Sequence, residues 1–189
     1  MLPRHCIAFL GTELLAEGEL PDVARAVKTA LDRGVEQSIA LLDAATGRPV
    51  AINFSGTEEE VLQRIPRARV PHAGRSRPSV IAREVTLLPR HWEWLDTQPG
   101  GASVALRKLV ELAARNARGA DAIRAARDAA YRFMHELMGD AAGFEEATRA
   151  LFAGDGERFE ALIANWPVAV RAHLLAVAGP AFGPAATDA

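Results

Sequence analysis

The stretch from Arg83 to Ala113 constrains the fold more than any other part of the sequence, because prolines and glycines divide it into short segments. Residues 83–88 are rich in β-branched and aliphatic side chains, which favours a strand. Pro89 suits the first turn of a helix, and the aromatic-rich segment 91–98 is expected to form that helix. The run Pro99-Gly100-Gly101 then prevents the helix from continuing.

A second helix is expected to begin at Ser103, whose hydroxyl can accept a hydrogen bond from a backbone N–H of the first turn. Apolar residues then recur at three- and four-residue spacing, which is typical of an amphipathic helix. This stripe consists of Leu106, Leu109, Val110 and Ala113. The whole stretch therefore predicts a strand, a short helix, a turn and a longer helix.

Residues 1–65 are expected to form a small ββαββα unit. Apolar residues on both sides of Gly11-Thr12 predict a β-hairpin. Pro21 opens a helix that Gly34 ends. Strand-like residues 38–43 follow, and the alternation of residues 50–54 predicts a fourth strand. Thr57 and Glu60 have capping-box spacing and open a second helix.

The rest of the chain is expected to be helical, which makes the fold class α+β. A bundle of about five helices is predicted: one from Ser103, one through Ile123, and three at 141–153, 155–165 and 168–178. The expected domains are residues 1–65 and 80–180. An Arg/Pro-rich linker at 66–79 would join them, and the tail 181–189 is expected to fray.

Positive charge is concentrated around this linker. Residues 64–90 contain seven arginines against Glu84 alone, a net charge of +6, whereas the whole chain has a net charge of −2. The guanidinium group suits phosphate oxygens, so these arginines predict contacts to duplex DNA or another polyanion. The alternatives are a solvated spacer or a contact to an acidic protein surface. The residues proposed for nucleic-acid binding are Arg67, Arg69, Arg75, Arg77, Arg83, Ser103, Arg107 and Lys108.

The order of strand, Pro89, helix, Gly101–Ser103 turn and helix resembles a ribbon-helix-helix unit. The resemblance implies a homodimer whose paired strands enter the major groove of DNA, with a phosphate at the start of the second helix. Residues 83–88 offer few side-chain donors and acceptors to read bases, so phosphate contacts are expected to dominate. A helix-turn-helix with residues 103–114 as recognition helix is the other interpretation.

The string from Arg83 to Val110 also resembles a bacterial family known as domain of unknown function 2239. The likeness extends to Ala8-Phe9, to the segment 43–49 and to the C-terminal helices. It therefore covers most of the chain. The family implies no activity, cofactor or catalytic residue.

No motif in the sequence indicates catalysis, a metal or a cofactor. Cys6 is the single cysteine, so neither a disulfide nor a cysteine-based zinc cage can form. His5 and Cys6 are neighbours in an extended segment and should point to opposite faces. There is no apolar run of membrane-spanning length and no long apolar signal segment, so a cytoplasmic protein with no membrane partner is expected.

The leading hypothesis is a non-enzymatic, homodimeric nucleic-acid-binding or regulatory protein. Arginines 67–83, Arg107 and Lys108 would supply its charge. The rival is a protein-interaction or scaffolding module, in which Trp92 and Trp94 anchor an apolar interface. An enzyme whose residues converge only in the fold is the third possibility.

Overall fold

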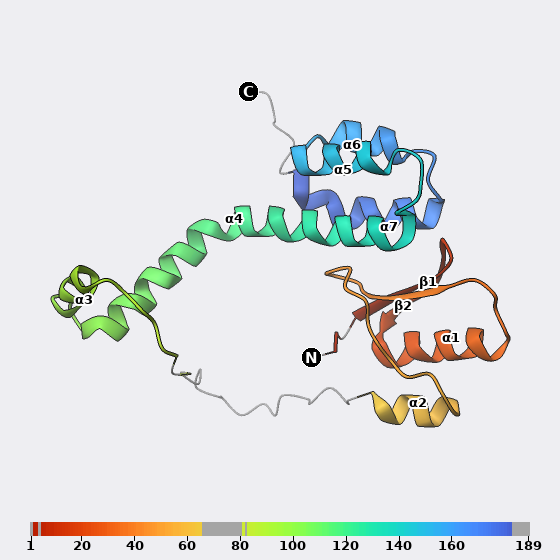
Figure 1. Cartoon of the computed structure of the whole chain (residues 1–189), viewed down its shortest axis with the longest axis horizontal. Helices are drawn as coiled ribbons and strands as arrows, with labels where there is room; N and C mark the ends of the chain where they lie inside the picture. Colours follow the sequence, from red (N-terminus) through yellow and green to blue (C-terminus); the bar gives the residue numbers. More distant parts are fainter. Residues whose placement is uncertain (1, 4, 66–80, 82, 183–189) are drawn as a thin grey trace. The chain divides into compact units, whose positions relative to one another are not determined.

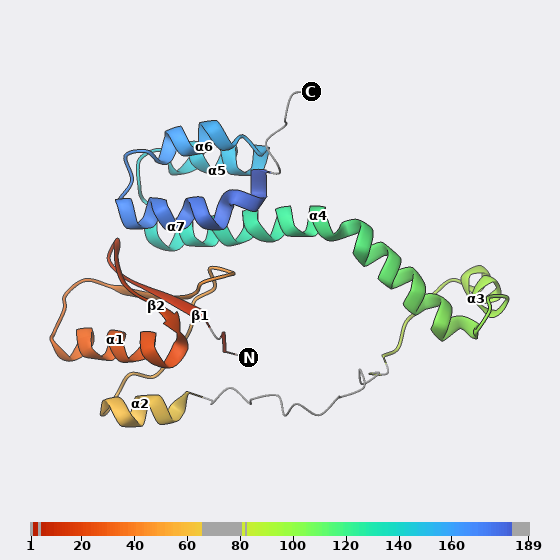
Figure 2. The same cartoon turned by 180° about the vertical axis from the view of Figure 1, so that it is seen from behind.

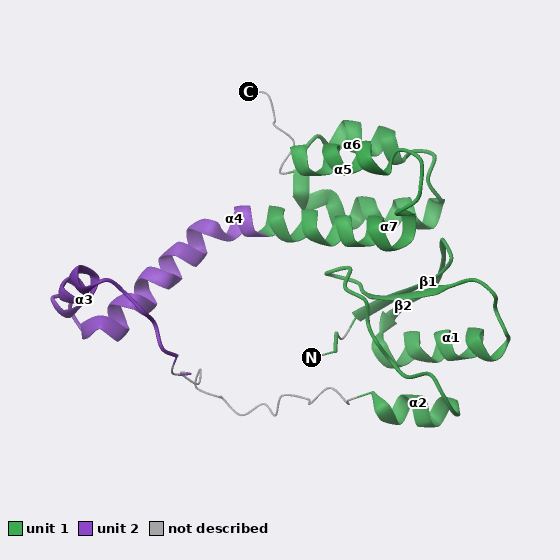
Figure 3. Cartoon of the chain, in the orientation of Figure 1, with its two compact units in different colours: residues 1–68, 122–189 green, residues 69–121 purple. Residues whose placement is uncertain are grey.

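The computed structural model describes residues 2–3, 5–65, 81 and 83–182. The chain divides into two compact units, and each is treated by itself (Figure 3). Unit 1 consists of residues 1–68 and 122–189, and unit 2 of residues 69–121. Sequence patterns place residues 80–180 in one domain, but the helices after residue 122 share a core with the N-terminal sheet. As the sequence predicts, the fold class is α+β.

Unit 1 contains a three-stranded antiparallel sheet with strand order β2-β1-β3. The strands are β1 (His5–Leu10), β2 (Glu13–Glu19) and β3 (Ile39–Asp43). Gly11, with φ of +58°, makes the turn between β1 and β2, which confirms the predicted hairpin. Because β1 is the central strand, it has backbone partners on both edges.

One face of the sheet packs against α1 (Leu20–Asp32). Cys6 and Ala8 of β1 share an apolar cluster there with Val23 and Val27 of the helix. The short helix α2 (Glu58–Arg64) follows, and Thr57 and Glu60 form the predicted capping box at its start. Alternate residues of β1 thus fill the space between the sheet and α1.

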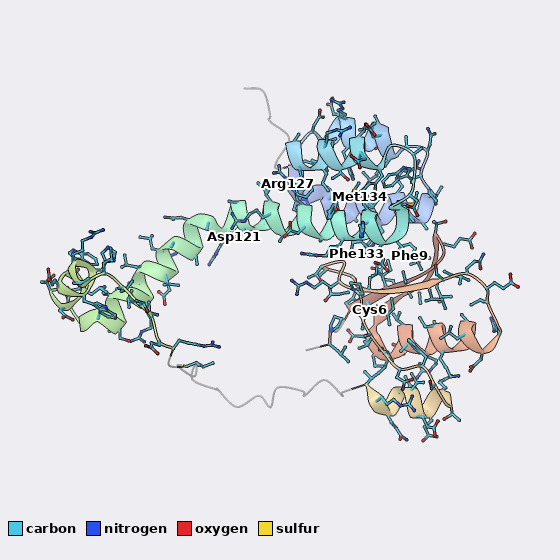
Figure 4. The ribbon with its side chains drawn as sticks, in the orientation of Figure 1. Cys6, Phe9, Asp121, Arg127, Phe133 and Met134 are labelled. Carbon is cyan, nitrogen blue, oxygen red and sulfur yellow. The ribbon has the colours of Figure 1, made fainter. Side chains whose placement is uncertain are left out.

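The other face of the sheet packs against the C-terminal helices. These are the end of α4 (Gly101–Met138), α5 (Phe144–Ala153), α6 (Gly156–Ile163) and α7 (Val168–Ala178), followed by the short 3-10 helix η1 (Gly179–Phe182). Ile7 and Phe9 join Phe133, Met134 and Leu174 in one core cluster (Figure 4). The sheet therefore lies between α1 on one side and the C-terminal helices on the other (Figures 1 and 2).

The predicted fourth strand at residues 50–54 is wrong. The segment after β3 makes an isolated bridge between Leu42 and Pro49, and the Val50 N–H donates to the Leu41 carbonyl at 2.8 Å. Pro49 has no N–H to donate, so a ladder cannot continue through it. The extended chain then leaves the sheet edge and runs to Thr57.

Helix α4 is one continuous helix of 38 residues, where the sequence predicts two separate helices. Gly119 lies inside it and does not interrupt it. None of the helices that the structure describes is both long enough and apolar enough to cross a membrane.

Unit 2 contains α3 (Pro89–Asp96) and the first half of α4. Pro89 stands in the first turn of α3, as predicted. The predicted strand at 83–88 is wrong, because these residues form no regular structure. Their alternation is compatible with a strand, but among the described residues of unit 2 there is no second strand with which they could pair.

Candidate interaction surface

The residues proposed for nucleic-acid binding are divided between described and undescribed parts of the chain. Arg67, Arg69, Arg75 and Arg77 lie outside the described residues. Arg83 is exposed ahead of α3, and Arg107 and Lys108 are exposed on α4. The structure therefore places three of the seven basic candidates on the surface of unit 2.

Ser103 lies within the first turn of α4, because this helix already begins at Gly101. The N-cap of α4 is therefore Gly100, and the prediction that Ser103 is the N-cap is wrong by three residues. The Ser103 carbonyl accepts a hydrogen bond of 3.2 Å from Arg107 Nε. The positive φ of Gly101, +75°, sets the direction in which the chain enters the helix.

The turn between α3 and α4 is fixed by polar groups around Trp94. The Trp94 carbonyl accepts hydrogen bonds from Thr97 Oγ1 at 2.7 Å and from Gln98 Nε2 at 3.3 Å. Gly100 follows with φ of +87°, a conformation that suits glycine. The side chains of Thr97 and Gln98 thus satisfy a backbone carbonyl at the end of α3, and the turn that they stabilise positions the start of α4.

Trp92 and Trp94 lie on the surface of α3. Their exposed fractions are 38% and 51%, whereas that of Leu95, in the same helix, is 2%. Neither tryptophan therefore belongs to a core formed by the chain itself. A large apolar side chain left on the surface is typical of an interface when other such residues lie near it in the fold.

Exposed apolar side chains are concentrated in unit 2. Eight of the thirteen large hydrophobic residues that are exposed in the described chain belong to it. We call this set the unit 2 apolar surface: Ile81, Val85, Leu88, Trp92, Trp94, Leu109, Val110 and Leu112. Leu95 and Ala105 are the only hydrophobic residues that are buried among those described in this unit.

The exposed part of α4 also carries a basic face. Arg107, Lys108, Arg115 and Arg118 lie along it with Glu111, and all five are exposed. Helical spacing places them away from the stripe formed by Leu106, Leu109, Val110 and Ala113. Among the described residues, none of these five charges is in an ion pair.

Net charge differs between the units. Unit 2 has nine basic and five acidic residues, a net charge of +4. Unit 1 has thirteen basic and nineteen acidic residues, a net charge of −6. The basic block predicted from the sequence is thus part of a wider asymmetry that extends to Arg118.

The groups that most often perform catalysis are not assembled in the described part of the chain. Cys6 is fully buried, and burial, with smaller contributions from the charges of Asp43 and Glu19, raises the pKa of its thiol to about 11. No group of three or more His, Cys, Asp and Glu side chains there is placed to hold a metal ion. Cys6 is therefore a packing residue, as the sequence suggests.

A pocket in unit 1 lies at the end of α4. It has a volume of about 470 Å³, and Thr12, His135 and Asp140 line it. His135 stacks on Tyr131 with ring centroids 6.1 Å apart. Within the described residues no hydrogen bond joins His135 to a nucleophile.

The described residues form an α+β fold in which unit 2 carries most of the large hydrophobic side chains that they expose. The family model described as an uncharacterized protein conserved in bacteria (DUF2239) matches residues 5–178, and the chain belongs to this family. A search of the curated proteins found no match, and a search of the solved structures found none either.

Proposed function

We propose that the chain is a non-enzymatic protein-interaction module that binds through the unit 2 apolar surface. The observation that carries this proposal is the concentration of eight exposed large hydrophobic residues around α3 and the first half of α4. Trp92 and Trp94 are residues of the type that dominates binding energy at interfaces. A cytoplasmic location, expected from the sequence, is part of this proposal.

The physical argument is the cost of leaving this surface in water. Covering apolar surface stabilises a complex by about 25 cal/mol per Å². Covering a few hundred Å² therefore contributes several kcal/mol toward association. Folded monomers rarely expose large contiguous apolar patches unless the patch binds something. The tryptophans, with few rotatable bonds, would lose little entropy when they are covered.

A pull-down from nuclease-treated bacterial lysate tests the proposal. The double variant Trp92→Ala/Trp94→Ala should lose the proteins that the wild type retains. Phe152→Ala is the matched control, because Phe152 is an exposed aromatic residue of unit 1, and it should retain them. Equal retention by the double variant and the wild type would contradict an interface centred on α3.

Nucleic-acid binding is the second candidate function, and the basic face of α4 favours it. Arg107, Lys108, Arg115 and Arg118 are exposed and lie within twelve residues against Glu111 alone. We propose that this face, together with the arginines at 67–83, contacts phosphates of duplex DNA without reading its sequence. Such a protein would act as a homodimer, as ribbon-helix-helix proteins do. Residues 83–88, however, do not form the strand that a ribbon-helix-helix unit contains.

Fluorescence anisotropy with a random-sequence DNA duplex tests this second function. Affinity should fall steeply with added salt, and Arg107→Ala/Lys108→Ala should weaken binding and lower the salt dependence. Arg75→Ala/Arg77→Ala should do the same. Arg158→Ala, which removes an exposed arginine of unit 1, is the control. An unchanged signal at low salt for the wild type would exclude the DNA hypothesis.

A further inference from the structure

The described residues of unit 2 form almost no core of their own. Leu95 and Ala105 are the only hydrophobic residues buried among them, and a unit with so small a core generally needs a disulfide, a metal or association with another chain. Cys6 is the single cysteine and lies in unit 1, so unit 2 has no disulfide. The described residues contain no cluster of metal-binding side chains. Apart from the continuity of α4 with unit 1, association with another chain is the source of stability that so small a core requires.

We propose that the unit 2 apolar surface pairs with the same surface of a second copy of this chain, in a two-fold antiparallel arrangement of α3–α4. This inference rests on the proposed interaction function and names its partner. A two-fold interface brings one patch against an identical patch, so the patch must be complementary to itself in shape and charge.

The shape of the exposed half of α4 suits a second helix of the same kind. Its stripe begins with Leu106, Leu109 and Val110 and continues as Ala113, Ala117 and Ala120 at the same helical spacing. In an antiparallel pair, the large residues of one helix lie opposite the small residues of the other. Large side chains against alanines permit close packing of two helices.

The charges of unit 2 are also complementary to those of a second copy. Residues 83–96 carry three acidic side chains, Glu84, Glu93 and Asp96, against two basic ones. Residues 101–120 carry four basic side chains against Glu111 alone. Among the described residues, none of these charges forms an ion pair within the chain. When Leu106 of one copy lies opposite Ala120 of the other, the acidic segment before α4 of each copy lies nearest the end of the other copy's α4 that carries Arg115 and Arg118.

The exposed area is of the size that a stable dimer requires. A large apolar or aromatic side chain has an area of roughly 150–250 Å², and the eight residues are about half exposed on average. Covering all eight would remove on the order of 700 Å² per copy, near the roughly 800 Å² per partner of a standard interface.

Sedimentation velocity and light scattering on the full chain, from low to high micromolar concentration, test the proposal. The wild type should sediment as twice its mass of 20.2 kDa. Val110→Glu, at a position that is 64% exposed, should raise the dimer dissociation constant by roughly tenfold or more, because the interface would bury an unpaired charge. Val168→Glu, at a 71% exposed position of unit 1, should leave the dimer intact.

Charge reversal provides the test that is specific for a second copy. Arg115→Glu/Arg118→Glu and Glu93→Lys/Asp96→Lys should each weaken the homodimer, and an equimolar mixture of the two variants should form a heterodimer. Circular dichroism and thermal unfolding show that each variant remains folded. Failure of the mixture to associate would overturn the antiparallel pairing.

The outcomes separate this inference from the proposed function. A wild-type chain that stays monomeric at every concentration overturns the second copy as partner. If protein capture from nuclease-treated lysate still depends on Trp92 and Trp94, the interaction function stands with a different partner. A dimer that Val168→Glu disrupts and Val110→Glu does not would also overturn the inference.

Discussion

The backbone oxygen of Ala129 in α4 lies where a side chain at Gly47 would have to be, because a Cβ built on Gly47 would approach it to 2.8 Å. The same Cβ would lie 3.1 Å from Cδ2 of Phe133. Arg132 Nη1 adds a hydrogen bond of 3.0 Å to the Thr46 carbonyl. The turn after β3 therefore rests directly on α4, and it fixes the edge of the sheet against the helical layer of unit 1.

Gly47→Ala should destabilise unit 1 by about 3 kcal/mol, combining left-handed backbone strain with the clash against α4. Gly34→Ala is the matched control, because Gly34 has a similar φ of +74° and open space around it. It should cost about 1–2 kcal/mol from strain alone. Urea unfolding measures both, and equal losses would show that the contact with Ala129 contributes nothing.

Thr57 and Ser103 should respond differently to substitution by alanine. The Thr57 hydroxyl accepts a hydrogen bond from the Glu60 N–H at 3.3 Å, so Thr57→Ala should cost about 1 kcal/mol and speed amide exchange at Glu60. Ser103 is already inside α4, so Ser103→Ala should cost nothing measurable. A substantial loss at Ser103 would show that the helix begins there after all.

The Cys6 thiol should be inert in the folded protein. Its pKa is raised to about 11, mainly by burial, so thiolate is scarce at neutral pH, and α1 shields the sulfur. A disulfide reagent should modify it slowly in native buffer and quickly in denaturant, with one thiol per chain. Fast modification without denaturant would mean that α1 opens readily from the sheet.

His173 should make unit 1 sensitive to mild acid. It packs edge-on against Phe133, with ring centroids 4.3 Å apart, and burial lowers its pKa. Its Nε2 is buried without a hydrogen-bond partner. The negative charge of Glu17 acts in the opposite direction to burial, because it raises the pKa of His173.

The sign of the pH dependence follows from the lowered pKa. Below the ordinary histidine pKa of about 6.5, the unfolded chain takes up a proton at His173 that the folded chain does not. The free energy of unfolding should therefore fall as pH drops from that value toward the lower folded pKa. His173→Phe should reduce this slope, and His91→Gln, at an exposed histidine, should not. An unchanged slope in His173→Phe would assign the effect to other groups.

Gly119→Ala should stabilise the exposed half of α4. Gly119 has open space around its Cα and lies inside the helix, where alanine is favoured over glycine by up to about 1 kcal/mol. Ala114→Gly, in the same exposed segment, should have the opposite effect. Amide exchange of residues 110–120 measures both, and slower exchange in Ala114→Gly would contradict helical order in this segment.

Local signals in the sequence predicted the elements of unit 1 that depend on one or two residues. Gly11 marks the hairpin, Pro21 the start of α1 and Thr57 the start of α2, and each acts through backbone geometry close to its own position. The last long helix, Val168–Ala178, has the predicted bounds because Pro167 precedes it and Gly179 follows it. Such signals need no knowledge of distant partners.

The wrong predictions concern segments whose structure depends on another part of the chain that could pair with them. Residues 50–54 and 83–88 alternate as strands do, but alternation does not show whether a neighbouring strand is available. Burial of the second face of β1 likewise depends on helices that follow it by more than a hundred residues. In the candidate site, the sequence indicates Trp92 and Trp94 as interface residues, but the exposure of Leu109, Val110 and Leu112 depends on the length of α4 and on what packs against it.

Helix α4 runs without a break from the apolar surface of unit 2 into the core of unit 1. Starting a helix is the costly step, whereas adding a residue to an existing helix is nearly free. The turns around Phe133, fixed in the core, supply a permanent nucleus from which the segment before Asp121 can grow. In the proposed dimer, ordering of the turns around Leu109 and Val110 therefore requires only elongation, which takes about nanoseconds per residue.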